Sequence, residues 1–106
     1  MKIADCPVRV TADVVGGKWK PLILLALKSK RRRFNELRRL VPEASHKVLT
    51  EQLRALESCG VITRTVHDAK SRRVEYSFSE YGDSLRPVLE AMAQWGTAHR
   101  KRGKSV

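Results

Sequence analysis

The chain has 106 residues, which is enough for one domain and too little for two. Its 22 lysines and arginines against 11 acidic residues give a net charge of +11, and two cysteines are too few for a disulfide framework. No apolar run approaches the roughly 18 residues of a membrane span, and the first residues show no signal-peptide core. We therefore expect a cytoplasmic protein with no membrane contact that binds a polyanion.

Proline, glycine and apolar spacing predict two helices in the first quarter of the chain. The first begins at Pro7 and runs to Val15, where Gly16 and Gly17 stop it. The second covers residues 18–27, with an apolar stripe at spacings of three and four. That stripe consists of Trp19, Leu22, Ile23, Ala26 and Leu27.

Two further helices follow, separated by a tight turn. A short helix over 34–41 has Phe34, Leu37 and Leu40 on one face and ends at Pro42. Ser45 is a favourable N-cap for the next helix, Ser45–Ser58, which Cys59 and Gly60 terminate. The residues expected to face inward are Val48, Leu49, Gln52, Leu53 and Leu56.

The hydrophobic period then changes from 3.6 to 2. Residues 61–66 and 73–78 predict two strands joined by a polar loop over 67–72. Ser79 can cap a last helix from Glu80, and Pro87 should kink this helix or split off its first turn. The order predicts a winged helix-turn-helix, mainly α with a small β-hairpin wing, spanning residues 1–106 with its core over about 5–96.

The positive charge is concentrated in two segments. Residues 28–39 carry net +6 and the tail 100–106 carries +4, whereas Ser45–Ser58 sums to zero. The neutral helix suits base-edge reading in the major groove, and the basic segments suit phosphate contacts. The predicted base readers are Ser45, His46, Lys47, Thr50, Glu51 and Arg54. The predicted backbone and wing contacts are Arg31, Arg32, Arg33, Arg38, Lys70, Arg72 and Arg73. Solvated faces and loops remain the alternative for each set.

The cysteines differ in their helical setting. Cys6 precedes Pro7 at a helix N-terminus, where the dipole favours the thiolate, whereas Cys59 follows a helix end. Cys6 is therefore the better candidate for a redox sensor, with a small buried residue at a subunit seam as the alternative. The three histidines are too scattered to predict a metal site, and no nucleophile–base arrangement indicates an enzyme. No cofactor is expected.

The last helix offers more apolar surface than a small core needs. Its apolar face consists of Leu85, Val88, Leu89, Met92 and Trp95. Such a terminal helix commonly pairs with a second copy, although it can also fold back onto its own subunit.

Several motifs, in order, resemble the HxlR-type winged helix-turn-helix regulators, a MarR-like family. The resemblance covers about residues 5–96. The similar segments are Cys6-Pro7-Val8, Gly16-Gly17-Lys18-Trp19, residues 33–37, residues 45–50, residues 53–57, residues 73–77 with Gly82, residues 87–89, and Trp95-Gly96. The wing tip departs from the family, because it has Lys70-Ser71-Arg72 where many members have a proline.

The resemblance implies a homodimeric repressor or activator that binds an inverted-repeat operator in double-stranded DNA. It also implies dimerisation through the terminal helices, and it allows a small-molecule or oxidant effector sensed through Cys6. The dimer residues expected on this basis are Val8, Leu85, Leu89, Met92 and Trp95. Two alternatives stay open: a non-specific architectural or RNA-binding protein, which the net charge also fits, and an adaptor whose winged helix binds protein.

Overall fold

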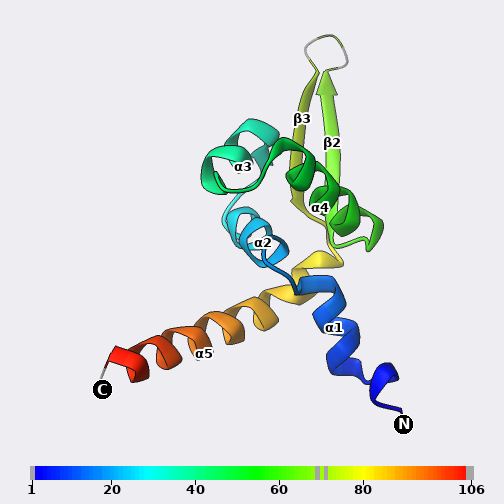
Figure 1. The fold of residues 1–106 in the computed structure, drawn as a ribbon. Helices are drawn as coiled ribbons and strands as arrows, with labels where there is room; N and C mark the ends of the chain where they lie inside the picture. Colours follow the sequence, from blue (N-terminus) through cyan, green and yellow to red (C-terminus); the bar gives the residue numbers. More distant parts are fainter. Residues whose placement is uncertain (1, 69, 71, 105–106) are drawn as a thin grey trace.

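The elements of the computed structural model follow the predicted order (Figure 1). It describes residues 2–68, 70 and 72–104, so parts of the predicted 67–72 loop, including Ser71, and the ends of the predicted 1–106 domain lie outside the described residues. The elements are η1 (Ile3–Asp5), α1 (Pro7–Val15), α2 (Lys20–Lys28), β1 (Arg32–Arg33), α3 (Phe34–Leu40), α4 (His46–Ser58), β2 (Ile62–Asp68), β3 (Arg73–Phe78), η2 (Gly82–Leu85) and α5 (Arg86–Lys104). The prediction of a mainly helical chain with a small wing is confirmed.

The wing belongs to a three-stranded antiparallel sheet in the order β1-β3-β2. The predicted hairpin is present, but β2 continues to Asp68, two residues beyond the predicted end. The third strand was not predicted: Arg32 pairs with Tyr76 and Arg33 with Glu75, directly before α3. The sheet therefore ties the base of the wing to the start of the helix-turn-helix.

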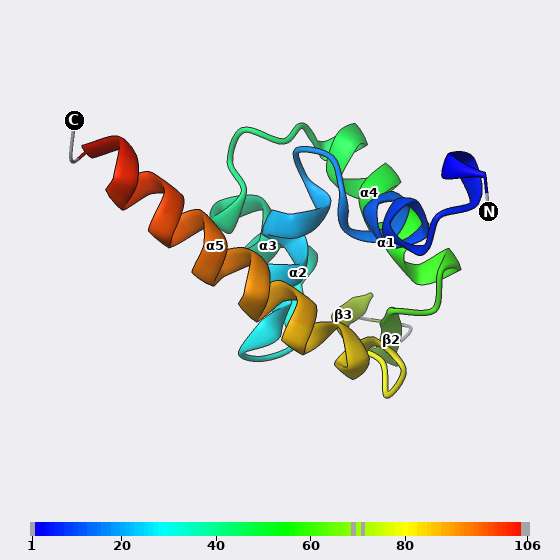
Figure 2. The same cartoon turned by 90° about the horizontal axis from the view of Figure 1, so that it is seen from below.

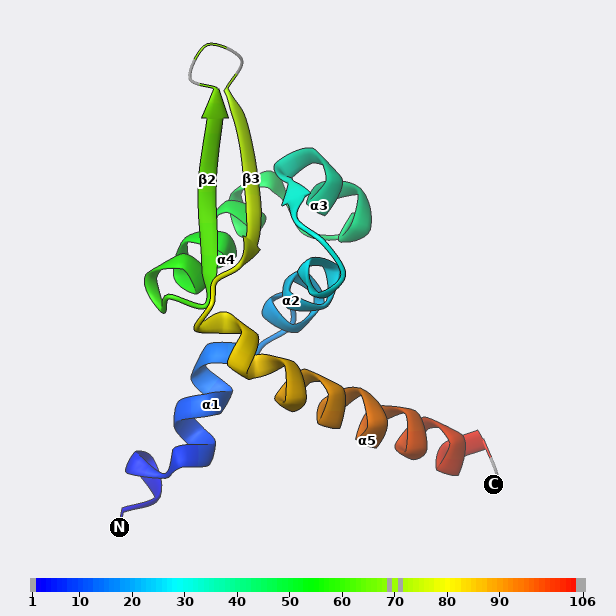
Figure 3. The same ribbon diagram turned by 180° about the vertical axis from the view of Figure 1, so that it is seen from behind.

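The core lies where α2 crosses α3 and α4 (Figure 3). The side chains that fill it at the centre are Ile23, Leu24, Leu27, Leu37, Leu49, Leu53 and Leu56. Two expectations are corrected here. Leu22 is 44% exposed and Leu24 is buried in its place, and Leu40 is 51% exposed at the end of α3. Both helices are short, so the elements that pack against them decide which apolar side chains of each helix are buried.

The junction before α5 is held by close packing around Gly82. A Cβ on this buried glycine would collide with the Val61 carbonyl oxygen. The Ser79 hydroxyl oxygen accepts a 2.8 Å hydrogen bond from the Gly82 N–H, and η2 follows as a 3₁₀ turn. Pro87 occupies the second position of α5, so the predicted split of the first turn is confirmed.

Both terminal helices project away from the core on the side opposite the wing (Figures 1 and 2). The radius of gyration is 15.5 Å, larger than the ~13 Å typical of a packed chain of this length. Leu89 is buried, and from Glu90 to Gly103 the residues of α5 are exposed apart from half-buried Gly96. The described part of the chain contains no helix with the length and apolarity to cross a membrane.

Candidate nucleic-acid interface

An open groove of about 510 Å³ separates α4 from the wing. Its α4 side is formed by His46, Thr50, Arg54 and Glu57, and Phe34 closes the end toward α3. The wing side is formed by Arg64, Arg72, Val74 and Tyr76. The groove thus brings together three of the six predicted base readers, His46, Thr50 and Arg54, and one predicted wing cation, Arg72.

The first turn of α4 is held at its start by Ser45. The Ser45 hydroxyl oxygen accepts a 3.1 Å hydrogen bond from the Val48 N–H, which confirms Ser45 as the N-cap. At the other end, Gly60 has a φ of +81°, the left-handed conformation that terminates helices. The helix therefore begins and ends at fixed points, which fixes the direction of its exposed face.

The exposed face of α4 carries polar groups of both signs. Lys47 and Glu51 lie 4.0 Å apart and are strongly exposed, so water and salt screen their attraction. Thr50 donates a 2.8 Å hydrogen bond to the His46 carbonyl oxygen, which leaves its oxygen free to accept another. The His46 ring lies 4.7 Å from the Phe34 ring, so α3 and the first turn of α4 are in direct contact beside the groove.

The wing contributes more cations than the sequence indicated. Arg64 lines the groove from β2, and the sequence offered no signal for it because six of the seven β2 residues are exposed. Arg72 lines both this groove and a second hollow of about 460 Å³ shared with Arg33 and Arg73. Arg73 also lies 3.7 Å from Glu75, which His67 contacts at 3.1 Å. The exposed Lys70 backbone N–H donates to Asp68 Oδ1 at 2.9 Å, near the wing tip.

The basic segment over residues 28–39 contains both exposed and half-buried arginines. Arg31, Arg33 and Arg38 are exposed, and Arg38 lines a hollow beside Asn35 and Pro42. Arg32 is different: its side chain is only 19% exposed and its Nε donates a 3.0 Å hydrogen bond to the Ala26 carbonyl oxygen. The structure therefore gives Arg32 a role within the fold.

Glu36 is the one acidic group in this basic segment. Its Oε1 accepts a 3.1 Å hydrogen bond from the Arg33 N–H, and its Oε2 lies 3.8 Å from Arg32. The backbone hydrogen bond from Arg33 is the main reason that the pKa of Glu36 is lowered, and the charges of Lys30, Arg32 and Arg33 add to it, against a smaller opposing effect of desolvation. The charged carboxylate of Glu36 thus stabilises the start of α3.

The remaining predicted residues lie away from the groove. Cys6 is half-buried at the N-cap of α1, Cys59 is exposed, and both thiols are free. Val8, Met92 and Trp95 are exposed on the projecting helices, whereas Leu85 is half-buried and Leu89 lies in the core of its own subunit. Within the described residues, no group of histidine, cysteine and acidic side chains could hold a metal ion.

Comparison with known proteins shows the family to which this winged helix-turn-helix chain belongs. A family model described as "HxlR-like helix-turn-helix" matches residues 14–104. The chain belongs to this family. It is 45% identical over 97 residues to YdeP of Bacillus subtilis strain 168, described as an HTH-type transcriptional regulator, with 92% of this chain and 76% of YdeP covered. The HxlR-like resemblance drawn from the sequence motifs is confirmed.

Solved structures agree with the HxlR-like assignment. The redox regulator HypR in its reduced form superposes with a TM-score of 0.89 at 40% identity, covering 95% of this chain and all of that chain. A crystal structure of the HTH-type regulator YtcD gives a TM-score of 0.84 at 45% identity, covering 91% of this chain and 98% of that chain. The fold is thus the winged helix-turn-helix of transcriptional regulators, and the family and the relatives are regulators rather than enzymes.

Proposed function

We propose that this HxlR-like regulator is a cytoplasmic homodimer that binds an inverted-repeat operator in double-stranded DNA. The observation that carries the proposal is the groove between α4 and the wing, where a neutral polar helix face lies opposite the cations Arg64 and Arg72. Such a division suits base reading by the helix and phosphate contacts by the wing. The family to which the chain belongs supports this use of the surface.

Within the proposed complex, α4 lies in the major groove. Side chains near the start of such a helix meet base edges, so we assign base contacts to its N-cap and to the polar residues of its outward face. These are Ser45, His46, Lys47, Thr50, Glu51 and Arg54. Of these, Arg54 combines exposure, a position in the groove and a fork of donors that matches the edge of guanine.

Phosphate contacts are assigned to the exposed cations around α4. Arg31, Arg33 and Arg38 flank the helix-turn-helix, and Lys70, Arg72 and Arg73 lie on the wing. Arg32 adds positive potential, while its donors serve Ala26, Ser29 and Glu36. Because these charges are separate from the reading helix, they supply attraction that falls with salt and is nearly independent of sequence.

Dimerisation through the terminal helices is supported by their exposed apolar side chains. Trp95 is 69% exposed and stacks on His99 at 4.8 Å, and Met92 and Val8 are exposed as well. Exposed apolar side chains that gather into a patch mark interfaces between proteins, which is the role proposed for these helices. Since Leu85 and Leu89 pack inward, the proposed dimer surface consists of Val8, Met92 and Trp95.

Redox or electrophile sensing is proposed at Cys6. The half-buried thiol lies at the N-cap of α1, one of the two proposed dimer helices, and HypR is named a redox regulator. Modification there would change the packing of α1 and so the separation of the two reading helices. Cys6→Ser should abolish a response of DNA affinity to diamide or quinones, and Cys59→Ser should retain it. An unchanged response in Cys6→Ser removes Cys6 as the sensor.

Binding-site selection from random DNA, followed by footprinting, tests the whole proposal. A palindromic consensus with half-sites about one helical turn apart, or a multiple of it, is the expected result. The alternative is a non-specific architectural protein, which the net charge of +11 also favours. In that case selection yields no consensus, no discrete site is protected, and affinity follows salt alone.

A further inference from the structure

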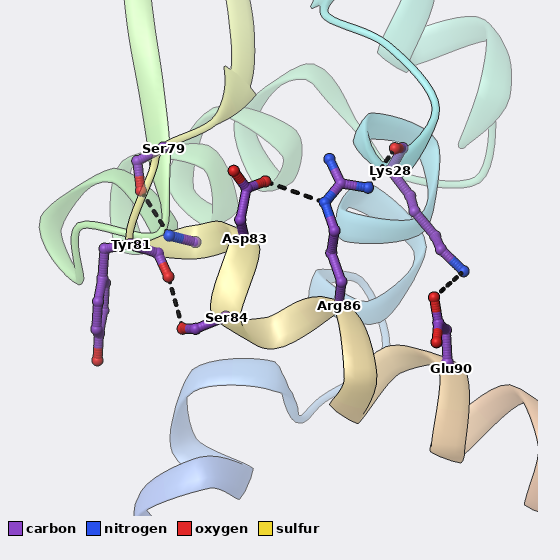
Figure 4. Close-up of polar contacts among 8 residues, drawn as sticks. Lys28, Ser79, Tyr81, Asp83, Ser84, Arg86 and Glu90 are labelled. Carbon is purple, nitrogen blue, oxygen red and sulfur yellow. Dashed lines mark hydrogen bonds and ion pairs between the residues drawn. The ribbon is translucent and has the colours of Figure 1, made fainter.

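Arg86 connects three parts of the fold at the root of α5, and Figure 4 shows two of its contacts, with Lys28 and Asp83. Its NH1 donates a 2.7 Å hydrogen bond to the Lys28 carbonyl oxygen, at the C-terminus of α2. Its Nε donates a 3.0 Å hydrogen bond to Asp83 Oδ1 in η2. Its guanidinium also lies 4.8 Å from the centre of the Phe78 ring, at the end of β3. One half-buried side chain thus contacts α2, the wing strand and η2 together.

The C-terminus of α2 is held from two sides. Arg86, which lies on α5, donates to the Lys28 carbonyl, and Arg32, which lies on β1, donates to the Ala26 carbonyl. Cations are favourable at this end of a helix because its free carbonyls carry partial negative charge. A second link runs beside the first, where Lys28 Nζ lies 3.7 Å from Glu90 Oε1 (Figure 4). The polar links between α2 and α5 are therefore concentrated within the first turns of α5.

We propose that Arg86 is a positioning residue that fixes the direction of α5 relative to the helix-turn-helix and so sets the half-site spacing that the dimer accepts. The inference rests on the proposed function, in which α5 joins two copies and α4 reads DNA. In such a dimer the separation of the two α4 helices depends on the angle at which each α5 leaves its subunit. Arg86 lies where that angle is decided.

The geometry of α5 amplifies small changes at its root. A helix rises about 1.5 Å per residue, so the exposed Trp95 lies about 14 Å beyond Arg86. A rotation of about 10° at the root moves Trp95 by roughly 2.4 Å in each subunit, and by roughly 5 Å over a symmetric pair. One base pair occupies about 3.4 Å of the DNA axis. A rotation of about 7° in each subunit is thus enough to shift the spacing by one base pair.

The first experiment measures spacing selectivity with the full chain. Arg86→Met keeps an apolar side chain beside Phe78 and removes every hydrogen-bond donor. Arg86→Lys keeps the charge but lacks the forked donors of the guanidinium. Arg100→Met removes one charge from the exposed part of α5. Fluorescence anisotropy gives Kd for operators that differ only in spacer length by one or two base pairs. Arg86→Met should reduce the preference for the best spacer roughly five-fold, with affinity for an isolated half-site unchanged.

The controls separate positioning from stability. Arg86→Lys should lie between wild type and Arg86→Met, and Arg100→Met should keep the wild-type spacing profile. If Arg86→Met weakens binding to every spacer and to the half-site by the same factor, Arg86 serves stability alone and the inference is overturned.

A second experiment needs no DNA. Spin labels are attached at Arg39→Cys in α3 and Thr97→Cys in α5, in a Cys6→Ser, Cys59→Ser background diluted with unlabelled chain. Arg86→Met should broaden the distribution of label distances roughly two-fold, and an unchanged distribution overturns the inference. If Arg86→Met broadens the distance distribution but the wild-type chain prefers no operator, Arg86 still orients α5, and the proposed function is refuted instead.

Discussion

The Ser45 hydroxyl oxygen accepts a hydrogen bond from the Val48 N–H at 3.1 Å, at the end of α4 that faces the proposed DNA. This bond satisfies one of the free N–H groups at the start of the helix. Because four of the proposed base readers lie in the first two turns, their positions depend on this cap.

Ser45→Ala should lower the free energy of unfolding by about 1 kcal/mol, since alanine cannot accept the Val48 N–H. Urea unfolding followed by circular dichroism measures the change. Ser45→Asn is the matched control because asparagine caps helices as well as serine does. A loss of stability in Ser45→Asn as large as in Ser45→Ala would show that the cap is not the cause.

Arg54 and Arg72 should differ in what they contribute to DNA binding. Arg54→Ala should weaken operator binding by about 1–3 kcal/mol and leave binding to random DNA nearly unchanged, since a base contact is lost. Arg72→Asn should weaken both and reduce the slope of log K against log salt by about 1. Asparagine is chosen because Arg72 has a φ of +53°, which asparagine tolerates. Equal losses on both DNAs in Arg54→Ala would reassign Arg54 to the phosphates.

Gly82→Ala should lower the free energy of unfolding by about 1–3 kcal/mol, because an added Cβ meets the Val61 carbonyl and the backbone must move. Gly103→Ala is the control: a Cβ there meets nothing within 4 Å, so a change within about 0.5 kcal/mol is expected. Thermal and urea unfolding measure both. A neutral Gly82→Ala would show that η2 can move away from the Val61 carbonyl without cost.

The sequence predicted the helix-turn-helix and the wing because their signals are local. Ser45, Gly60 and Pro42 mark the ends of helices, and the change of period marks β2 and β3. The third strand has no such signal: β1 is two residues long, and its partner β3 lies far along the chain. A strand of this length is visible only once the fold brings Arg32 beside Tyr76.

The candidate site was predictable in part for the same reason. The outward face of α4 follows from helical period, which put His46, Thr50 and Arg54 on one side of the helix, and in the structure all three line one groove. The roles of Arg32 and Arg64 depend on tertiary contacts. Arg31, Arg32 and Arg33 are alike in the sequence, but of the three it is Arg32 that donates to the Ala26 carbonyl. Arg64 lies on a strand with exposed residues on both faces, so its direction follows from the packing of β2 beside α4.

Glu36 should make folding stability depend on acid pH. Its pKa is lowered in the folded chain below the usual 4.5, so its contribution is complete above that value and is lost as the pH falls through the lowered pKa. Glu36→Gln keeps an acceptor for the Arg33 N–H but does not titrate. The stability difference between wild type and Glu36→Gln, measured by urea unfolding from neutral to acid pH, should shrink in that window. A constant difference would exclude this titration.

The pairing of Arg33 with Glu75 closes the chain into a loop that contains α3, α4 and β2. In kinetic terms this contact is non-local: the β2–β3 hairpin can form early and by itself, but β1 joins only after the helix-turn-helix has folded back. In this order, the pairing of β1 with β3 is the last part of the sheet to form, and it joins the wing to the helix-turn-helix. Amide exchange should therefore report that the Arg33–Glu75 pairing opens first, before the β2–β3 hairpin or the helix-turn-helix unfolds.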